Sequence, residues 1–227
     1  MINVFTITSP VQSNPELESV LRKQASVLTI PARKVILEAE TTPRGVYYIS
    51  SGRTRHYLLG ADGMEKVIMV LTAGWFFGET AGFLDVQTHL YVMTEELTEL
   101  LFIPTTKFRA LLRQNPSFNE AIMASFAYKN QLMCREIESQ VFYTSRERLL
   151  QLLYFSADDT LAVDGNWYFL KHNYTQHELG TILGVSRVTI SKFVNEFCKD
   201  GIIRVVNRRM QINIRHYDSL GRQLAVR

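Results

Sequence analysis

Residues 175–197 carry the side chains whose types and spacing best indicate a specific chemistry, that of reading a nucleic-acid duplex. Thr175 and Glu178 stand three residues apart, as in a capping box, and apolar residues follow at helical spacing. Gly184 suits the left-handed position that ends a helix, and Ser186 can cap a second helix directly after it. The spacing therefore predicts two short helices joined by a tight glycine turn.

The second of these helices would present short polar and basic side chains on its outward face: Arg187, Val188, Ser191 and Lys192. Arginine and lysine can donate to guanine N7 and O6, and valine can contact the thymine methyl group. Ser186, Thr189, Gln176 and Arg208 complete the predicted DNA-binding set. The pattern predicts a helix-turn-helix for the major groove of double-stranded DNA. The alternatives are an ordinary helical hairpin, or a ligand-binding module whose helix-turn-helix contacts only protein.

Composition agrees with a DNA-binding protein of one or two domains. The 227 residues carry a formal charge of +3, but residues 187–227 hold nine basic and three acidic side chains. Two cysteines without metal-ligand spacing argue against a disulfide framework and a metal site. We find no nucleophile elbow, P-loop or zinc-protease motif, and therefore do not expect an enzyme. Without a signal peptide or a membrane-length apolar run, we expect a soluble cytoplasmic protein.

Residues 34–103 have the pattern of a small β barrel or double-sheet roll. Short strand-like runs alternate with turn residues, and Gly60-Ala-Asp-Gly63 predicts a hairpin. The predicted strands cover residues 46–49, 54–59, 65–71, 89–93 and 99–103. A roll of this size can hold one small ligand between its sheets.

A short helix over residues 105–115 and a long one over 117–142 are predicted next. The long helix has a seam at 3-4-3-4-3 spacing, consisting of Met123, Phe126, Asn130, Met133, Ile137 and Gln140. This spacing favours pairing with a second copy of the chain, and the alternative is a helix packed only on its own domain. Residues 147–155 predict a further helix, 157–165 a loop and 166–170 a strand. Residues 202–206 and 211–214 predict a hairpin with a basic tip, which makes the motif a winged helix-turn-helix.

This order of elements resembles the CRP/FNR family of bacterial transcription regulators. The resemblance rests on Gly74…Phe77-Gly78-Glu79 and on Leu179-Gly…Gly184-Val-Ser-Arg-Val-Thr-Ile-Ser191. It implies an α+β fold with a jelly roll like a cyclic nucleotide-binding domain (residues 1–115), a dimerisation helix (116–143) and a winged helix-turn-helix (144–227). It further implies a homodimer on an inverted-repeat site, a small-molecule effector beside the long helix and, for an activator, contact with RNA polymerase.

The departures from the family bear on the effector. The cyclic-AMP branch has Arg-Ser where this chain has Thr88-His89, and Thr-Ser where it has Met133-Cys134. Without that arginine a cyclic phosphate loses its bidentate partner, so we do not expect cyclic AMP to be the effector. The chain resembles the branch that senses chlorinated phenolic acids, which shares the Val-Thr-(Ile/Val)-Ser start of the recognition helix and a pocket without the phosphate arginine. We expect a small aromatic or anionic effector.

Effector contacts are expected from Gly78, Glu79, Thr88, His89, Tyr91, Met133 and Cys134, with Trp75, Phe76 and Phe77 adding aromatic walls. No cofactor is expected. The alternative within the family is a gas or redox sensor, with His89 as a haem ligand or Cys134 as a reactive thiol. The cysteine cluster that the oxygen-sensing branch uses for its iron–sulfur cluster is absent from the N-terminal part of this sequence.

Overall fold

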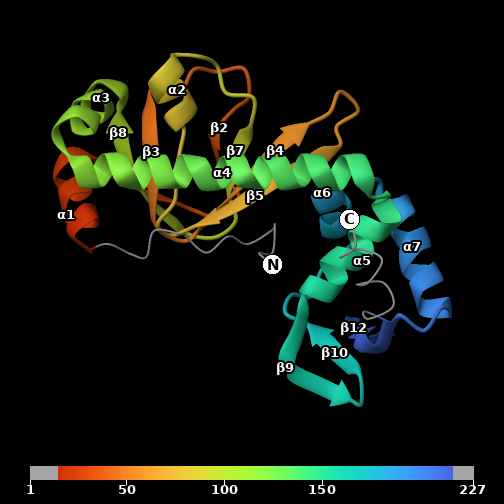
Figure 1. Cartoon of the computed structure of the whole chain (residues 1–227). Helices are drawn as coiled ribbons and strands as arrows, with labels where there is room; N and C mark the ends of the chain where they lie inside the picture. The colour runs from red at the N-terminus through yellow and green to blue at the C-terminus, as the bar shows by residue number, and fades with distance from the viewer. Residues whose placement is uncertain (1–14, 217–227) are drawn as a thin grey trace. The chain divides into compact units, whose positions relative to one another are not determined.

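The computed structural model describes residues 15–216, shown in Figure 1. Within this range the chain divides into two compact units, one up to Ile137 and one from Glu138 onward. Of the helices in the described part of the chain, none combines the length and apolarity needed to cross a membrane.

The first unit is a roll of two antiparallel four-stranded sheets, as the sequence predicts. One sheet has the order β1-β8-β3-β6, formed by Ser26–Ile30, Thr98–Pro104, Gly45–Ser51 and Phe76–Phe77. The other has the order β2-β7-β4-β5, formed by Val35–Leu37, Tyr91–Thr94, Arg53–Leu59 and Glu65–Thr72. The predicted hairpin at residues 60–63 joins β4 to β5, and Gly60 N donates to Met64 O at 2.8 Å.

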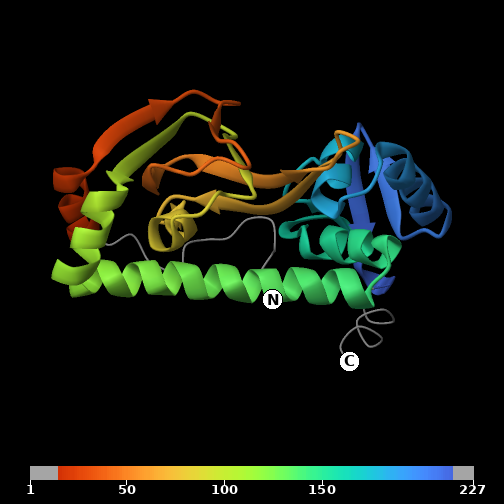
Figure 2. The same ribbon diagram turned by 90° about the horizontal axis from the view of Figure 1, so that it is seen from above.

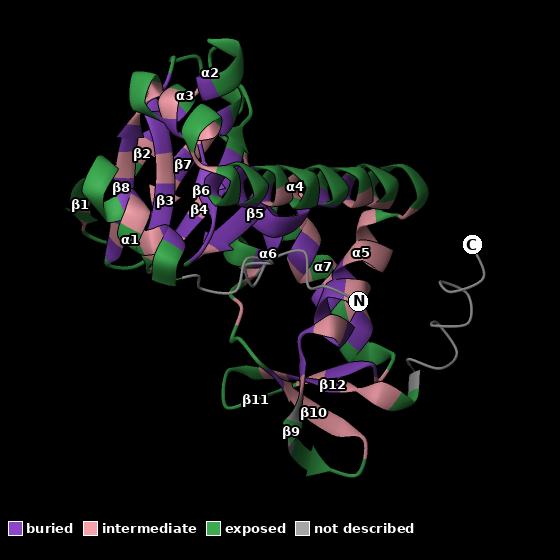
Figure 3. Cartoon of the chain, turned by 60° about the vertical axis from the view of Figure 1, so that its left-hand side comes forward, coloured by how far each residue is buried: buried purple, intermediate pink, exposed green. Residues whose placement is uncertain are grey.

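The first unit also holds α1 (Pro15–Gln24), α2 (Glu79–Leu84), α3 (Thr105–Gln114) and most of α4 (Pro116–Phe142), whose residues from Glu138 onward belong to the second unit. Figure 2 shows the N-terminal part of α4 running along the roll. Its buried side chains face the sheets and include Phe118, Ile122, Ser125 and Leu132. Most of its remaining surface is exposed (Figure 3). The sequence analysis predicted α3 and α4, but not α1 or α2.

Two clusters of buried side chains stabilise the roll. One joins α1, β3 and β8 to α3 and the start of α4 through Leu21, Val46, Phe108 and Phe118. The other lies between the two sheets and includes Trp75, which is fully buried. Burial of apolar surface on this scale fixes the sheets on which the site residues stand.

The second unit is a winged helix-turn-helix. Its helices are α5 (Ser145–Phe155), α6 (Gln176–Leu183), α7 (Arg187–Lys199) and a short 3₁₀ helix, Ile214–His216. Its antiparallel sheet has the order β11-β12-β10-β9, formed by Ile203–Val206, Arg209–Asn213, Trp167–Leu170 and Ala157–Asp164. Leu149, Leu153, Leu179, Ile190 and Phe197 are among its fully buried side chains.

The prediction of a loop at residues 157–165 is wrong, because Ala157–Asp164 forms strand β9. Aspartates are rare in strands, and here they gave the segment a turn-like composition. The Asp158 carboxylate accepts hydrogen bonds from Thr160 N at 3.0 Å and from Thr160 Oγ1 at 2.6 Å. The pairing with β10 is irregular, with register shifts on both sides of Tyr168, so no clean alternation marks the strand in the sequence.

Candidate functional site

Helices α6 and α7 are held in place by the local signals that the sequence contains. Thr175 Oγ1 accepts from Glu178 N at 3.1 Å, and the Glu178 carboxylate accepts from Thr175 N at 2.7 Å, which completes the capping box. Gly184 ends α6 with a φ of 68°, a conformation that glycine adopts without strain. Ser186 Oγ accepts from Thr189 N at 3.1 Å and caps α7.

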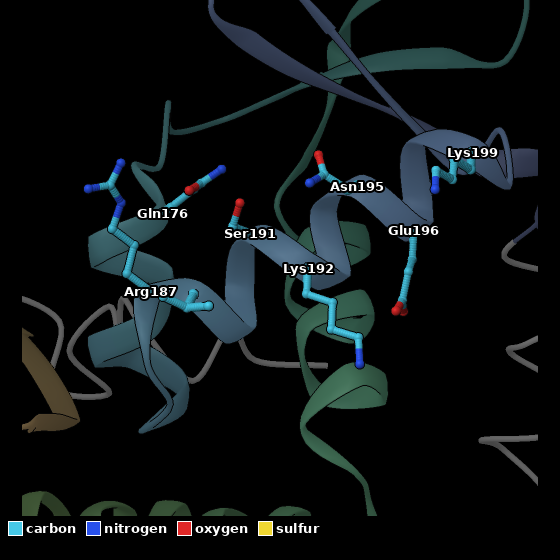
Figure 4. Close-up of a pocket in the computed structure, with 8 residues that line it drawn as sticks. Gln176, Arg187, Ser191, Lys192, Asn195, Glu196 and Lys199 are labelled. Atoms are coloured by element: carbon cyan, nitrogen blue, oxygen red, sulfur yellow. The ribbon is translucent and has the colours of Figure 1, made fainter.

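The face of α7 that these caps position forms a shallow polar groove with the start of α6 (Figure 4). It is lined by Gln176, Arg187, Val188, Ser191, Lys192, Asn195, Glu196 and Lys199. Val188 is 79% exposed although it is apolar, which suits a side chain that contacts a partner rather than the core. All four predicted outward residues and Gln176 therefore share one surface. Asn195, Glu196 and Lys199 were missed, although helical spacing continues the same face through them.

The remaining three predicted DNA-binding residues occupy other positions. Ser186 and Thr189 bond to each other, with 2.9 Å between their hydroxyl oxygens, and serve the cap of α7. Arg208 is exposed in the turn between β11 and β12, where its φ is 61° and that of Asn207 is 50°. The predicted basic tip is thus a two-residue turn with Arg208 at its apex.

The C-terminal half of α7 is tied to α5 by Arg146. Its guanidinium lies 4.6 Å from the centroid of the Phe197 ring, 3.1 Å from the Asp200 carboxylate and 3.5 Å from that of Glu196. The charged pairs are half exposed and contribute little by themselves. Together with the stacked ring they fix the direction of the helix that carries the groove.

A cavity of about 600 Å³ lies in the first unit, between the β4–β5 sheet, α2 and α4. Its wall is mostly apolar and includes Leu37, Leu58, Ile68, Met69, Leu71, Phe77, Leu84, Leu90, Val92, Phe126 and Met133. Its polar lining comes from His56, Glu79, Thr80, Gln87, Thr88, His89, Lys129 and Asn130. A cavity of this size with a few polar groups is typical of a small-molecule site.

Two buried polar side chains in this wall, Glu79 and His56, and the partly buried Lys129 contact their neighbours directly. Glu79, at the start of α2, forms an ion pair with Lys129 of α4, and Lys129 Nζ also donates to Phe76 O at 2.8 Å. His56 of β4 is 3% exposed, and its Nε2 lies 3.0 Å from Thr54 Oγ1. Burial, reinforced by the positive charge of Lys129, lowers the pKa of His56 to about 3, so its imidazole is neutral at physiological pH.

Five of the seven predicted effector residues line this cavity: Gly78, Glu79, Thr88, His89 and Met133. Tyr91 and Cys134 do not. Tyr91 stacks on Tyr57 with 5.4 Å between ring centroids, and Cys134 is exposed on α4. All three neighbouring aromatic residues belong to the core clusters, but only Phe77 also lines the cavity.

His56 and Lys129 were missed by the sequence analysis. His56 stands between Thr54 and Leu58 on the inward face of a predicted strand, so alternation could have revealed it. Lys129 follows Phe126 by three residues and precedes Met133 by four, which places it on the same helix face as both. His89 is exposed at the cavity. In the described part of the chain, no three His, Cys, Asp or Glu residues gather as metal ligands would.

The six residues of the predicted α4 seam are exposed to solvent, and three of them, Phe126, Asn130 and Met133, also border the cavity. Met123 is 57% exposed, Phe126 44%, Met133 39% and Ile137 59%, and Asn130 and Gln140 are exposed as well. Several large apolar side chains therefore share one exposed stripe of a single helix.

Two domain families match this chain. Residues 27–115 match the cyclic nucleotide-binding domain, and residues 147–222 match the Crp-like helix-turn-helix domain. The chain belongs to the CRP/FNR family of transcription regulators. It is therefore a DNA-binding regulator with an effector-binding domain, and not an enzyme.

One curated relative is similar to this chain in sequence, and two solved structures are similar to it in fold. The cAMP-activated global transcriptional regulator CRP of Haemophilus influenzae is 27% identical over 169 residues, which cover 72% of this chain and 73% of that protein. The c-di-GMP responsive regulator CLP of Xanthomonas campestris matches with a TM-score of 0.75 at 18% identity, covering 88% of this chain and 98% of that one. CprK complexed with OCPA matches with a TM-score of 0.73 at 16% identity, covering 96% and 97%.

Proposed function

We propose that this CRP/FNR regulator binds an inverted-repeat promoter site as a homodimer, and that a small effector in the roll controls its affinity for that site. The observation that carries the proposal is the groove on α7, where Arg187, Val188, Ser191 and Lys192 are presented together. Side chains at the start of a recognition helix reach base edges in the major groove. Arg208, at the tip of the wing, is placed to add a phosphate contact.

The exposed stripe on α4 supports the homodimer. Two parallel copies of α4 would bury Met123, Phe126, Met133 and Ile137 against each other, with Asn130 facing its mate. A polar residue in such a seam fixes the register of the two helices at some cost in stability. A two-fold dimer would in turn present two recognition helices to half-sites about one helical turn apart.

The lining of the cavity supports an effector that is small, largely apolar and aromatic or anionic, and that is not cyclic AMP. Among the described residues of the lining, Lys129 is the only lysine and none is an arginine, and Glu79 already neutralises that lysine. A cyclic phosphate would be left without a free guanidinium or ammonium partner. If the protein activates transcription, RNA polymerase is its further partner, and the cytoplasm is where both would meet it.

Selection of DNA from a random-sequence pool by the purified protein tests this function. We expect an inverted repeat, a binding constant that falls steeply with salt, and no change in affinity on adding cyclic AMP. Calorimetry with cyclic AMP should show no heat of binding at micromolar concentration. Recovery of a site without two-fold symmetry would refute the dimeric mode, and cyclic AMP binding that tightens the complex would refute the effector class.

A further inference from the structure

The charged groups in the effector cavity cancel each other. Within residues 15–216, which the structure describes, the lining holds one carboxylate, Glu79, and one ammonium, Lys129, and the two are paired. Lys129 has three N–H donors, of which Glu79 and the Phe76 carbonyl take two, so at most one remains for a ligand. His56 is neutral, and His89, the fourth titratable group in the lining, is exposed to solvent.

Because the charges of Glu79 and Lys129 cancel, the cavity favours uncharged ligands over charged ones. An anion that enters loses its hydration and finds a lysine whose charge is already compensated by a carboxylate 3% exposed to solvent. An uncharged polar group loses much less on leaving water, because one or two ordinary hydrogen bonds replace its contacts with solvent. The apolar wall, with the Phe77 and Phe126 rings, suits the rest of an aromatic ligand.

His56 is placed to bind the polar end of such a ligand. Its Nε2 lies 3.0 Å from Thr54 Oγ1, which leaves Nδ1 for a ligand. The Phe77 ring meets the imidazole edge-on at 81° with 5.3 Å between centroids, and this contact restricts its rotation. A neutral imidazole can donate or accept one hydrogen bond at the free nitrogen, which matches a hydroxyl or an amide.

We infer that the cavity selects an uncharged aromatic molecule carrying a hydroxyl or carboxamide group, and that His56 recognises this group. The inference rests on the proposed effector role of the cavity and narrows it from aromatic or anionic molecules to neutral ones. Glu79 sets the charge preference by neutralising Lys129.

Calorimetry on the wild-type chain with matched ligands tests the charge preference directly. The probes are 4-methylbenzamide and 4-methylbenzoate, which differ mainly in charge, and 4-methylphenol, which is neutral at pH 7 because a phenol ionises near pH 10, about as tyrosine does. We expect the amide and the phenol to bind about tenfold more tightly than the carboxylate, a difference of about 1.4 kcal/mol. Equal or tighter binding of the carboxylate overturns the inference, and so does failure of all three probes to bind at millimolar concentration.

Two variants locate the cause. Glu79→Gln removes the neutralising charge and should move the preference toward 4-methylbenzoate by about tenfold, whereas Glu96→Gln, the same change at an exposed position outside the cavity, should not. His56→Phe should remove the preference for 4-methylphenol over toluene. An unchanged preference in both variants contradicts the assignment, and circular dichroism establishes that each variant is folded.

Operator binding separates this inference from the proposed function. If the neutral probes bind but leave DNA affinity unchanged, the effector role fails while the charge preference stands. If 4-methylbenzoate binds most tightly and alters DNA affinity, the effector role stands and the inference of a neutral ligand fails.

Discussion

The groove on α7 and the cavity in the roll are built in different ways. Nearly all groove residues lie within one helix, and capping residues directly beside them set its start. The polar groups of the cavity come instead from β4, α2, α4 and the loop between α2 and β7, which only the folded roll brings together. A site within one helix depends on local hydrogen bonds, whereas an assembled site depends on the packing of the whole unit.

The largest effect on DNA binding is expected from breaking the proposed dimer, because the groove on α7 needs a second copy of the chain to bind an inverted repeat. Ile137→Asp would place an unpaired carboxylate from each protomer in the proposed seam, at a cost of several kcal/mol per charge. We expect sedimentation to show a monomer, and operator affinity to fall at least about a hundredfold, about 2.7 kcal/mol. Gln131→Asp, on the same helix outside the seam, is the control. A dimeric Ile137→Asp protein at micromolar concentration would exclude this seam.

The second effect tests whether the assembled site also stabilises its unit. Glu79→Leu leaves Lys129 buried without a counter-charge and should lower the free energy of unfolding of the roll by about 3–5 kcal/mol. The double variant with Lys129→Met should recover most of the loss. Urea unfolding followed by Trp75 fluorescence in a Trp167→Phe background reports on this unit alone. A loss under about 1 kcal/mol, one third of the lower end of that range, would show that the pair is dispensable.

The third prediction concerns a variant that should weaken DNA binding without changing the free energy of unfolding. Arg187→Ala removes an exposed side chain, so we expect no change in unfolding but a loss of about 1–3 kcal/mol in DNA binding, concentrated at one base position. Lys199→Ala, at the other end of the groove, should weaken binding equally for all sequences. Competition assays with single-base operator variants measure both. Full affinity and unchanged base preference in Arg187→Ala would contradict its assignment.

The fourth effect depends on pH. Folding lowers the pKa of His56 from about 6.5 to about 3. Because the unfolded chain then binds a proton more readily than the folded one, the free energy of unfolding is highest above pH 6.5 and falls as the pH drops from 6.5 toward 3. At pH 5 the loss should be about 2 kcal/mol relative to pH 7.5. His56→Gln should show a pH dependence weaker by this amount in urea unfolding. Identical pH dependence in the two proteins would show that His56 accepts a proton in the folded roll.

The smallest effect concerns a local signal. Thr175→Ala removes the hydroxyl that caps α6 and should cost about 1 kcal/mol. Thr144→Ala, in the equivalent capping box of α5, is the matched variant and should cost about as much. Hydrogen exchange should accelerate in α6 for the first and in α5 for the second. Accelerated exchange in the roll from either variant would contradict the purely local role of these caps.

The difference between local and assembled sites also explains which parts of the fold could be predicted from the sequence. Capping pairs, turn glycines and helical spacing identified α5, α6, α7 and the wing from the sequence, because short-range hydrogen bonds determine these elements. Strand β9 was missed because its pairing with β10 outweighs the turn-like preference of its aspartates. The short helix α2 was missed because its N-cap residue is Gly78, which has no side chain to mark the start of a helix in the sequence.

The candidate site shows the same limit. Family resemblance located Gly78, Glu79, Thr88 and His89 at the cavity. It could not show that Phe77 lines the cavity while Trp75 and Phe76, its neighbours in the core, do not. Pairing of Glu79 with Lys129 depends on how α4 lies on the roll, a tertiary contact that spacing along the chain does not encode.

The wing turn has a consequence for how this protein can be engineered. A two-residue turn of this kind favours glycine at its second position, and Arg208 holds the same left-handed conformation at a cost of about 1 kcal/mol. Thermostability and nucleic-acid affinity thus place opposite demands on residue 208: glycine would relax the hairpin, but only arginine brings a cation to its apex. Selection for heat resistance alone would favour glycine at residue 208. Selection for DNA affinity would retain Arg208 and with it the strained turn.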